Sequence, residues 1–273
     1  MELRTLFDLE PHGPDTFVGI GPRYPWGGLY GGQIVAQALR AAAATVDGSQ
    51  QVHSLRAYFI RRGDHTEPIR FEVDRIRNGR SFTTRRVVAR QAVGAILNLE
   101  ASFQAFEEAD DIQTVRPPVG VPGPDELKGE RWLEAFERRE VPAARLAEMV
   151  DGERTGAGRS LAWMKTINEI GDDQLLQRCW MAYISDDMPT DAVRNAHPDF
   201  AGTHGMTFNA SLDHTIWFHR PVRADRWHLY DVTCHSYVGA RGLSIGHVFS
   251  DDGIHVATIA QEVLVRDVRR KQD

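Results

Sequence analysis

The stretch from Gly27 to Val46, GGLYGGQIVAQALRAAAATV, constrains the fold more than any other part of the chain. After the paired glycines Gly31 and Gly32, apolar residues occupy almost every position. A thin polar stripe remains, made of Gln33, Gln37 and Arg40. A helix that is apolar nearly all round is usually buried. The stretch therefore predicts a central helix wrapped by other elements.

The start of this helix is almost bare backbone, because glycines fill it. A helix start presents free N–H groups and a partial positive charge. Such an end can hold an anion or polarise a carbonyl oxygen. A plain turn that leads into a core helix is the alternative interpretation, and this stretch alone leaves both open.

Composition narrows the class of protein. The chain has 273 residues, 42% hydrophobic and 26% charged, which is ordinary for a soluble protein of one large or two average domains. A net charge of −6, with charges interspersed, argues against nucleic acid as a partner. The longest apolar runs are too short to span a bilayer, and MELRTLFDLE is no signal peptide. Two cysteines give no disulfide framework, so we expect a cytoplasmic protein without a membrane partner.

Strand patterns follow the helix in the first half. Four runs rich in β-branched and aromatic residues span 52–63, 68–80, 81–91 and 94–106. Asn78-Gly79 between two of them is a strong hairpin signal. The last run alternates, with its apolar residues on one face. The first half thus predicts one buried helix and an antiparallel meander. Its strand arginines would be solvated or would meet an acidic ligand, and solvation is expected for most of them: Arg75, Arg77, Arg85, Arg86 and Arg90.

The middle of the chain, residues 107–159, has a different character. An acidic EEADDI precedes VRPPVGVPGPDEL, whose Pro and Gly content blocks regular structure. Residues 129–150 are compatible with one or two short amphipathic helices. We expect a connector lying across the surface between two domains. The predicted boundaries are 1–108 for the N-terminal domain, 109–158 for the connector and 159–273 for the C-terminal domain.

The second half repeats the plan of the first. Residues 172–187 read as a helix with Asp172 or Asp173 as N-cap, and four strand-like runs follow: 209–220, 226–238, 241–250 and 253–267. RSFTTRRVVARQAVG matches RGLSIGHVFSDDG in outline, and PIRFEV matches RWHLYDV, about 160 residues apart. A helix-plus-meander unit occurring twice predicts an α+β fold of two packed copies.

These residues carry a resemblance to the acyl-CoA thioesterase II family, whose members fuse two hotdog domains, each a long helix wrapped by an antiparallel sheet. The first half matches through YGGQIVAQAL, VHSLRAYFIRRGD, GRSFTTRRV and EASFQ, and the second through MAYISD, SLDHTIWFHRP, ARG and the AQE of ATIAQEVLV. The blocks keep their order along nearly the whole chain and are weakest in the Pro-rich connector.

The resemblance implies hydrolysis of fatty acyl-CoA to free acid and CoA, without metal, cofactor or covalent triad. The family holds its water with an Asp, a hydroxyl residue and a Gln. By motif these fall on Asp186 of MAYISD, Ser211 of ASLDH and Gln261 of AQE. The family often has Thr at the hydroxyl position, and the Ser here keeps the hydroxyl. Gly32 and Gln33 are weaker candidates for polarising the thioester carbonyl.

The residue types fit these roles. Asp186 follows an apolar helical run, near its C-terminus, where the helix dipole does not favour a carboxylate. A carboxylate in an apolar pocket can have a raised pKa and act as a general base. Ser211 and Gln261 would then orient the water. The alternatives are a solvated aspartate in a turn and ordinary polar residues on strands.

Two other patterns are weighed as catalytic sites. Gly242-Leu243-Ser244-Ile245-Gly246 has the form of a nucleophile elbow, but it lies inside a predicted strand, and Asp251 and His255 follow too closely. His214, beside Asp213, could act as a base, although a histidine hydrogen-bonded in the core is commoner. The histidines form no HExxH and the cysteines no CxxC, so no metal site is predicted.

Two rival functions remain at this stage. A non-catalytic acyl-CoA binding protein would bind the same ligand and release no thiol. An enoyl-CoA hydratase of the same fold would need a spaced Asp/His pair, whereas Asp213 and His214 are adjacent. We also expect a homo-oligomer, a dimer or tetramer, since sheet edges must be covered.

Overall fold

The computed structural model describes residues 5–131, 134–149, 158–201 and 207–268. Its chain divides into two compact units, each assembled from discontinuous stretches. The first unit contains Met1–Ile112, Asn168–Asp186 and Thr215–Arg223, and the second contains Gln113–Ile167, Asp187–His214 and Ala224–Asp273. The boundaries at 108 and 158 follow the sequence repeat and stay a prediction. Parts of the expected connector (132–133 and 150–157) and of the N-terminal stretch (1–4) lie outside the described residues.

The sheet of the first unit is antiparallel, with the strand order β1-β2-β4-β5-β6-β3. Its strands are β1 (Glu10–Pro11), β2 (Thr16–Gly19), β3 (Gln50–Phe59), β4 (Ile69–Asn78), β5 (Phe82–Gln91) and β6 (Gly94–Ala105). The predicted meander is present in β4, β5 and β6. β3 departs from it, because it pairs with β6 instead of β4.

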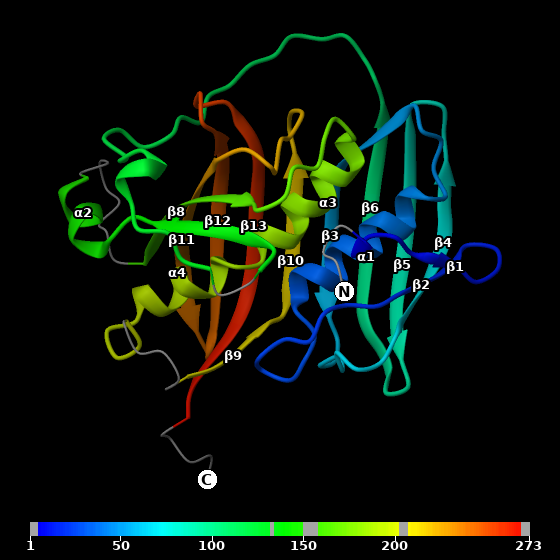
Figure 1. The fold of residues 1–273 in the computed structure, drawn as a ribbon, viewed down its shortest axis with the longest axis horizontal. Helices are drawn as coiled ribbons and strands as arrows, with labels where there is room; N and C mark the ends of the chain where they lie inside the picture. The colour runs from blue at the N-terminus through cyan, green and yellow to red at the C-terminus, as the bar shows by residue number, and fades with distance from the viewer. Residues whose placement is uncertain (1–4, 132–133, 150–157, 202–206, 269–273) are drawn as a thin grey trace. The chain divides into compact units, whose positions relative to one another are not determined.

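The central helix predicted from the glycine-led stretch is α1 (Gly31–Ala43), which packs against β2 to β6 and is buried from Gly32 to Leu39 (Figure 1). A second helix, α3 (Gln174–Ser185), packs along α1 in the same unit. Of its two candidate N-caps, Asp173 is the one used, since its Oδ1 accepts from Leu175 N at 2.9 Å and Leu176 N at 3.1 Å.

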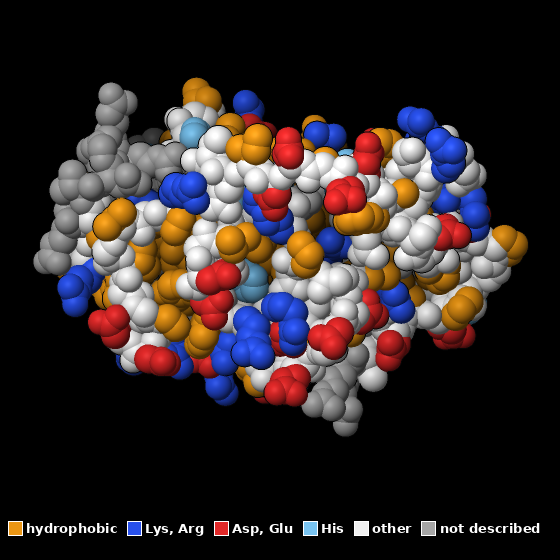
Figure 2. All heavy atoms as spheres, turned by 90° about the horizontal axis from the view of Figure 1, so that it is seen from above, with side chains coloured by type: hydrophobic (Ala, Val, Ile, Leu, Met, Phe, Trp, Pro, Cys, Tyr) orange, Lys and Arg blue, Asp and Glu red, His pale blue; other side chains and the backbone are white. Residues whose placement is uncertain are grey.

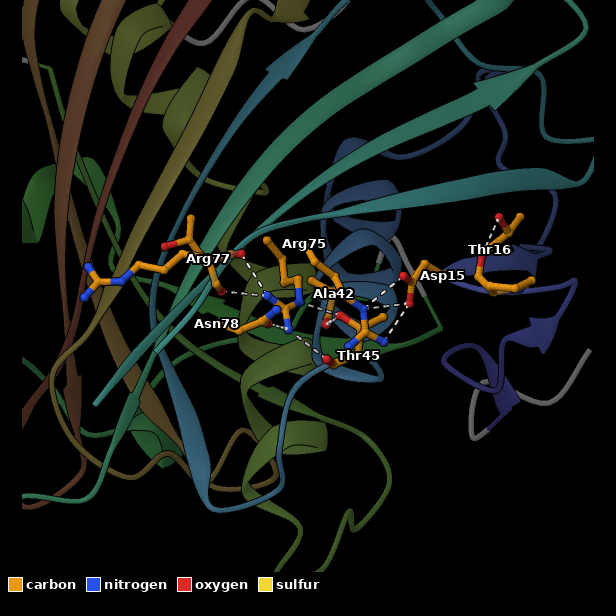
Figure 3. A network of polar contacts seen from close by, with 10 residues as sticks. Asp15, Thr16, Ala42, Thr45, Arg75, Arg77 and Asn78 are labelled. Carbon is orange, nitrogen blue, oxygen red and sulfur yellow. Dashed lines mark hydrogen bonds and ion pairs between the residues drawn. The ribbon is translucent and has the colours of Figure 1, made fainter. Parts of the chain in front are cut away.

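Most of the strand arginines were expected to be solvated, and one of them is buried. Arg85 is 2% exposed, and its guanidinium donates to Thr45, just after α1, and to residues of β4 and β5; Thr45, Arg77 and Asn78 are labelled in Figure 3. It reaches Thr45 Oγ1 at 2.7 Å and Thr45 O at 2.9 Å, and Asn78 Oδ1 at 2.7 Å. The carbonyls of Arg77 and Thr84 accept from Nη1 at 2.9 and 3.0 Å. Thr45 follows the C-cap Ala44, and its Oγ1 donates to Ala42 O at 2.9 Å, so Arg85 ties the turn after α1 to β4 and β5.

The sheet of the second unit is also antiparallel, with the order β7-β8-β11-β12-β13-β9. Its strands are β7 (Phe136–Glu140), β8 (Arg159–Thr166), β9 (Thr207–Ser211), β11 (His228–Val238), β12 (Arg241–Ser250) and β13 (His255–Asp267). β11, β12 and β13 form a meander as β4, β5 and β6 do, with β12 and β5 as the middle strands. This agrees with the alignment of the repeat. The strand expected at 209–220 is divided at Leu212 into β9 and β10 (Asp213–Phe218).

Both faces of the second sheet are covered. The helix α4 (Pro189–Ala196) packs on β8, β11, β12 and β13, and a Cβ atom on Gly242 would lie 2.2 Å from Val193 Cγ1. On the opposite face, Trp163 and Phe249 belong to an apolar cluster with part of the expected connector: Val115, Val121, Leu127, Val141 and Leu146. The connector is therefore part of the second unit's core.

The connector also differs from its prediction in secondary structure. Its described residues form a 3₁₀ turn, η2 (Pro124–Glu126), the strand β7 and the short helix α2 (Ala143–Glu148). Of the one or two short helices expected over 129–150, α2 is one, whereas FERRE forms β7, in which Phe136 and Arg138 share a buried face as the strand pairs with β8.

Basic and acidic side chains lie among one another on the face drawn in Figure 2. Among the described residues, no helix has the length and apolar character needed to cross a membrane.

Candidate functional site

The first turn of α1 offers backbone N–H groups, as its glycines predict. Tyr30 is the N-cap, in extended conformation and without a side-chain cap. Ile34 N, bonded to Tyr30 O at 3.4 Å, makes the first intrahelical hydrogen bond. The N–H groups of Gly31, Gly32 and Gln33 therefore precede the helical ladder and lie at its positive end.

The C-terminus of α3 packs against this turn. Asp186 is the C-cap of α3 and is 7% exposed. Its Oδ2 lies 2.5 Å from where a Cβ atom on Gly31 would be, and Tyr183 O lies 2.2 Å from the corresponding position on Gly32. Only glycine leaves room at these two positions. The Asp186 carboxylate is thus placed beside the positive end of α1, a neighbour that reasoning about its own helix alone did not find.

Gln33 lies fully buried, with both ends of its carboxamide engaged. Tyr24 donates from its hydroxyl to Gln33 Oε1 at 2.8 Å, and Gln33 Nε2 donates to Gln37 Oε1 at 3.2 Å. Gln37 Nε2 in turn donates to Leu6 O and Ile20 O, both at 2.8 Å. The polar stripe of α1 is therefore an internal ladder that binds the N-terminal segment to the helix. A role for the Gln33 side chain in binding substrate stays a prediction.

Ser211 and Gln261 are brought together in the second unit. They come from the paired strands β9 and β13, and Gln261 Nε2 donates to Ser211 Oγ at 2.7 Å. Gln261 is buried and Ser211 is half-buried. Because the serine oxygen accepts from the amide, its own proton points to a different acceptor. Their side chains thus form one polar group at the pairing of β9 with β13.

His214 fixes the orientation of the Gln261 carboxamide. Its Nδ1 lies 2.5 Å from Gln261 Oε1, and the ring is fully buried. Burial lowers the pKa of His214 to about 4, so the imidazole is neutral at pH 7. A neutral ring whose Nδ1 carries the proton donates to Oε1, which leaves Nε2 of the glutamine directed at Ser211. The prediction of a core histidine is confirmed, but its partner was not foreseen.

Asp213 holds the backbone beside this group. Its Oδ1 accepts from Glu262 N at 2.7 Å, and burial raises the pKa of Asp213 above its ordinary value. Asp213 and His214 are therefore both engaged with the strand that carries Gln261, and they do not face each other as an acid–base pair.

Asp187, next to Asp186 in the chain, belongs to a buried ion network that the sequence did not reveal. Arg138 Nη1 donates to Asp187 Oδ2 at 2.9 Å and to Asp191 Oδ2 at 2.8 Å, and Nη2 lies 3.0 Å from Glu140 Oε2. The side chains of Arg138 and Asp187 are 8% and 1% exposed. One guanidinium from β7 thus holds the segment between α3 and α4.

The structure rules out the nucleophile elbow. Ser244 lies in the middle of β12, paired with Gln261 of β13, and its Oγ donates to Gln261 O at 3.4 Å. β12 continues without a break from Arg241 to Ser250 and is followed by a strand, whereas the elbow requires a turn into a helix. Across the part of the chain that the structure describes, no three His, Cys, Asp or Glu residues are grouped so as to hold a metal ion.

The three residues predicted to hold the water fall in different units. Asp186 ends the second stretch of the first unit, and Ser211 and Gln261 belong to the second. Their joint role stays a prediction.

Two family models match the chain. Residues 21–104 match the acyl-CoA thioesterase N-terminal domain, and residues 109–265 match the acyl-CoA thioesterase C-terminal domain. The chain is 35% identical over 255 residues to acyl-CoA thioesterase 2 of Haemophilus influenzae, and the match covers 87% of each chain. It is 34% identical over 288 residues to human acyl-coenzyme A thioesterase 8, covering 96% of this chain and 88% of the human protein.

Solved structures of similar fold agree with the family found by sequence. The acyl-CoA thioesterase II TesB2 from Mycobacterium marinum is 34% identical, has a TM-score of 0.85 and is matched over 100% of both chains. A hot dog protein from Alicyclobacillus acidocaldarius is 18% identical with a TM-score of 0.77, and the match covers 97% of this chain and 98% of that one. The second likeness bears on the fold alone. With its two helix-bearing antiparallel units, this chain is a double-hotdog acyl-CoA hydrolase and belongs to the acyl-CoA thioesterase II family.

Proposed function

We propose that this enzyme hydrolyses fatty acyl-CoA to a free fatty acid and CoA with a water molecule held by Asp186, Ser211 and Gln261. The observation that carries the proposal is the hydrogen bond of 2.7 Å between Gln261 Nε2 and Ser211 Oγ, with the amide oriented by His214. A carboxamide fixed in this way sets the direction of the serine hydroxyl, which is what positioning a water requires.

In the proposed reaction, Asp186 takes a proton from the water, and the oxygen attacks the thioester carbonyl carbon. The negative charge that develops on the carbonyl oxygen is stabilised by backbone N–H groups at the start of α1, with Gly32 as the candidate donor. The C–S bond then breaks, and the thiolate of CoA leaves and accepts the proton from Asp186. The burial of Asp186 beside the first turn of α1 supports this division of roles.

The test is a free-thiol assay with acyl-CoA substrates on the wild type and on Asp186→Asn. We expect the variant to lose at least about 100-fold in kcat, the lower end of what a general base contributes. Ser211→Ala and Gln261→Ala should also lower kcat while the proteins stay folded. Turnover at the wild-type rate by a folded Asp186→Asn protein would rule out the assignment.

The alternative functions predict different results in the same assay. A non-catalytic acyl-CoA binding protein would bind the substrate and release no thiol. A hydratase would add water to an enoyl-CoA without breaking the thioester, but Asp213 and His214 are each engaged with β13 and are not arranged for it.

We also propose that the protein acts in fatty acid metabolism in the cytoplasm, as a dimer or tetramer and without a cofactor. The oligomer is supported by the general need to cover exposed sheet edges. The reducing compartment is supported by the free cysteines. Light scattering coupled to size-exclusion chromatography measures the oligomeric state. A monomer at micromolar concentration would contradict the proposed dimer or tetramer.

A further inference from the structure

A tight turn precedes α1 in the first unit and exposes an aromatic ring. We call residues Tyr24–Gly28 the entry turn. Gly27 N donates to Tyr24 O at 3.1 Å, and Gly27 has a φ of 72°, which favours glycine. The indole of Trp26 is 40% exposed and stacks on the Tyr24 ring, with centroids 4.9 Å apart and planes at 16°. A rigid stacked indole at the surface is a suitable platform for a flat ring.

Two arginines at the end of β3 lie against this turn and the neighbouring hairpin. Arg62 Nη2 donates to Trp26 O at 2.5 Å, and Arg61 Nη1 donates to Ala95 O at 2.8 Å. A Cβ atom on Gly28 would lie 2.6 Å from Arg62 Nε, so the glycine provides the space for this guanidinium. Leu29 N donates to Gly63 O at 3.0 Å and fixes the two segments together.

Among the described residues, neither of these arginines forms an ion pair with a carboxylate. Four exposed arginines of β4 and β5 form ion pairs: Arg70 and Arg90 with Glu72, Arg75 with Asp15, and Arg86 with Asp74. The Asp64 carboxylate accepts from Thr66 N at 2.7 Å, and Glu67 Oε2 accepts from Ala92 N at 3.2 Å.

The donors of the two side chains match a phosphate. A guanidinium has five N–H donors, and Arg61 and Arg62 each use one of them on a backbone carbonyl. Planar N–H pairs of arginine bind phosphate oxygens in a bidentate way. Two exposed and anchored guanidiniums beside a stacked indole therefore form a surface suited to a nucleotide that carries several phosphates.

The position of this surface relates it to the first turn of α1. Gly28 and Gly31 are three residues apart, and three residues span at most about 11 Å. Arg62 thus lies a short distance from the turn against which Asp186 packs. In CoA, the thioester is joined through the pantetheine arm to an adenosine that carries a 3′-phosphate and a pyrophosphate.

We propose that Arg61, Arg62 and Trp26 bind the nucleotide end of CoA, with the guanidiniums on the phosphates and the indole against the adenine. This inference rests on the proposed function in one respect, that acyl-CoA is the substrate. It assigns to the entry turn and to the two arginines beside it the recognition of the nucleotide, which is the part of the substrate that does not react.

Truncated substrates test the inference. Acyl-pantetheine keeps the thioester and lacks the adenosine and all phosphates. We expect Arg62→Ala and Arg61→Ala each to raise KM for acyl-CoA about tenfold, the effect of one lost charge-assisted contact. Their kinetics with acyl-pantetheine should equal those of the wild type. Arg62→Lys keeps the positive charge but lacks the planar pair of N–H donors. Its KM for acyl-CoA should lie between those of the wild type and Arg62→Ala.

Arg86→Ala is the matched control, because this exposed arginine on β5 pairs with Asp74, whereas Arg62 donates to Trp26 of the entry turn. It should leave both substrates unaffected. Equal losses on both substrates in Arg61→Ala and Arg62→Ala, or an unchanged KM for acyl-CoA, would overturn the inference.

A binding measurement separates this inference from the catalytic proposal. Calorimetric titration with adenosine 3′,5′-bisphosphate needs no turnover. The wild type and Arg86→Ala should bind it, whereas Arg62→Ala and Trp26→Ala should bind it at least about tenfold more weakly. If the wild type releases no thiol yet shows this pattern, the catalytic proposal fails and the nucleotide site stands. If all four proteins bind the probe equally, the nucleotide site is refuted.

Discussion

The Oδ2 atom of Asp186 lies 2.5 Å from the position that a Cβ atom on Gly31 would occupy. Carbon and oxygen atoms that are not bonded to each other do not approach this closely, so a side chain at position 31 must displace the carboxylate. The same packing recurs one residue later, where Tyr183 O occupies the space beside Gly32. The first turn of α1 and the last turn of α3 are therefore matched in shape through two missing side chains.

We predict that Gly31→Ala lowers kcat by about 100-fold, because a displacement of about 1 Å in a catalytic group costs this much. KM should change little, since the displaced group is not the one that binds the nucleotide. Gly48→Ala is the control, because nothing lies within 4 Å of a Cβ atom there. The free-thiol assay and a thermal melt measure both variants. A folded Gly31→Ala protein with unchanged kcat would contradict the role given to this packing.

The buried His214 predicts a loss of stability in acid. Its pKa is about 4 in the folded protein, below the ordinary value of 6.5. Protonation therefore favours the unfolded chain. The contribution of His214 is fully present above pH 6.5, falls as the pH drops toward 4, and amounts to about 3 kcal/mol at most.

Urea unfolding between pH 7 and pH 4 measures this contribution. In His214→Asn the fall in the free energy of unfolding over that range should be smaller by up to about 3 kcal/mol. Other groups, including the buried His228 with its lowered pKa, contribute equally to both proteins. Identical slopes for the two proteins would show that His214 is not kept neutral by the fold.

The Arg138 network predicts a large cost for removing one cation. Arg138→Met leaves Asp187, Asp191 and Glu140 without their shared partner, and we expect a loss of about 3–5 kcal/mol in the free energy of unfolding. The double variant Arg138→Met/Asp187→Asn should recover part of that loss, because it removes the most buried of the carboxylates. Chemical denaturation of the single and double variants measures the coupling. Additive losses would mean that the pair does not interact.

Arg85 predicts a destabilisation of the first unit. Arg85→Met leaves two buried acceptors of Thr45 without their donor, at a cost of about 1–3 kcal/mol for each unsatisfied group, and removes the part-buried bond to Asn78. Arg90→Ala serves as the control, because its ion pair with Glu72 is exposed and contributes at most about 1 kcal/mol. Thermal melts should show a clearly lower Tm for Arg85→Met alone. A Tm equal to that of the control would show that the hydrogen bonds of Arg85 do not stabilise the protein.

Periodicity predicted much of the fold, because period and burial agree in long elements. α1 and the strands β4 to β6 and β11 to β13 lie where the pattern places them. β8 escaped because both of its faces are covered, and its SLAWM run shows no alternation. β7 escaped because Arg138 occupies an inward position of the strand, where charge is expected to signal solvent. In both cases the partner that explains the residue is remote in sequence.

The candidate site was predicted only in part. Ser211 and Gln261 were named from motifs, and the strand pairing places them in contact. The bond from His214 to Gln261 spans 47 positions, and no local pattern reports it. Arg85 was one of five strand arginines of which most were expected to be solvated, and no local pattern singles it out, because its acceptors on Thr45 lie 40 positions away.

The first unit is completed late in the sequence. It takes Asn168–Asp186 and Thr215–Arg223 in addition to the first 112 residues. At about 5–20 residues per second, a ribosome needs on the order of 10 s to move from residue 112 to residue 223. During that interval α1 has no α3 to cover it, and its apolar surface is available to a chaperone or to another nascent chain. The first half synthesised alone should therefore expose apolar surface and be prone to aggregation, because it needs the second half to complete its fold.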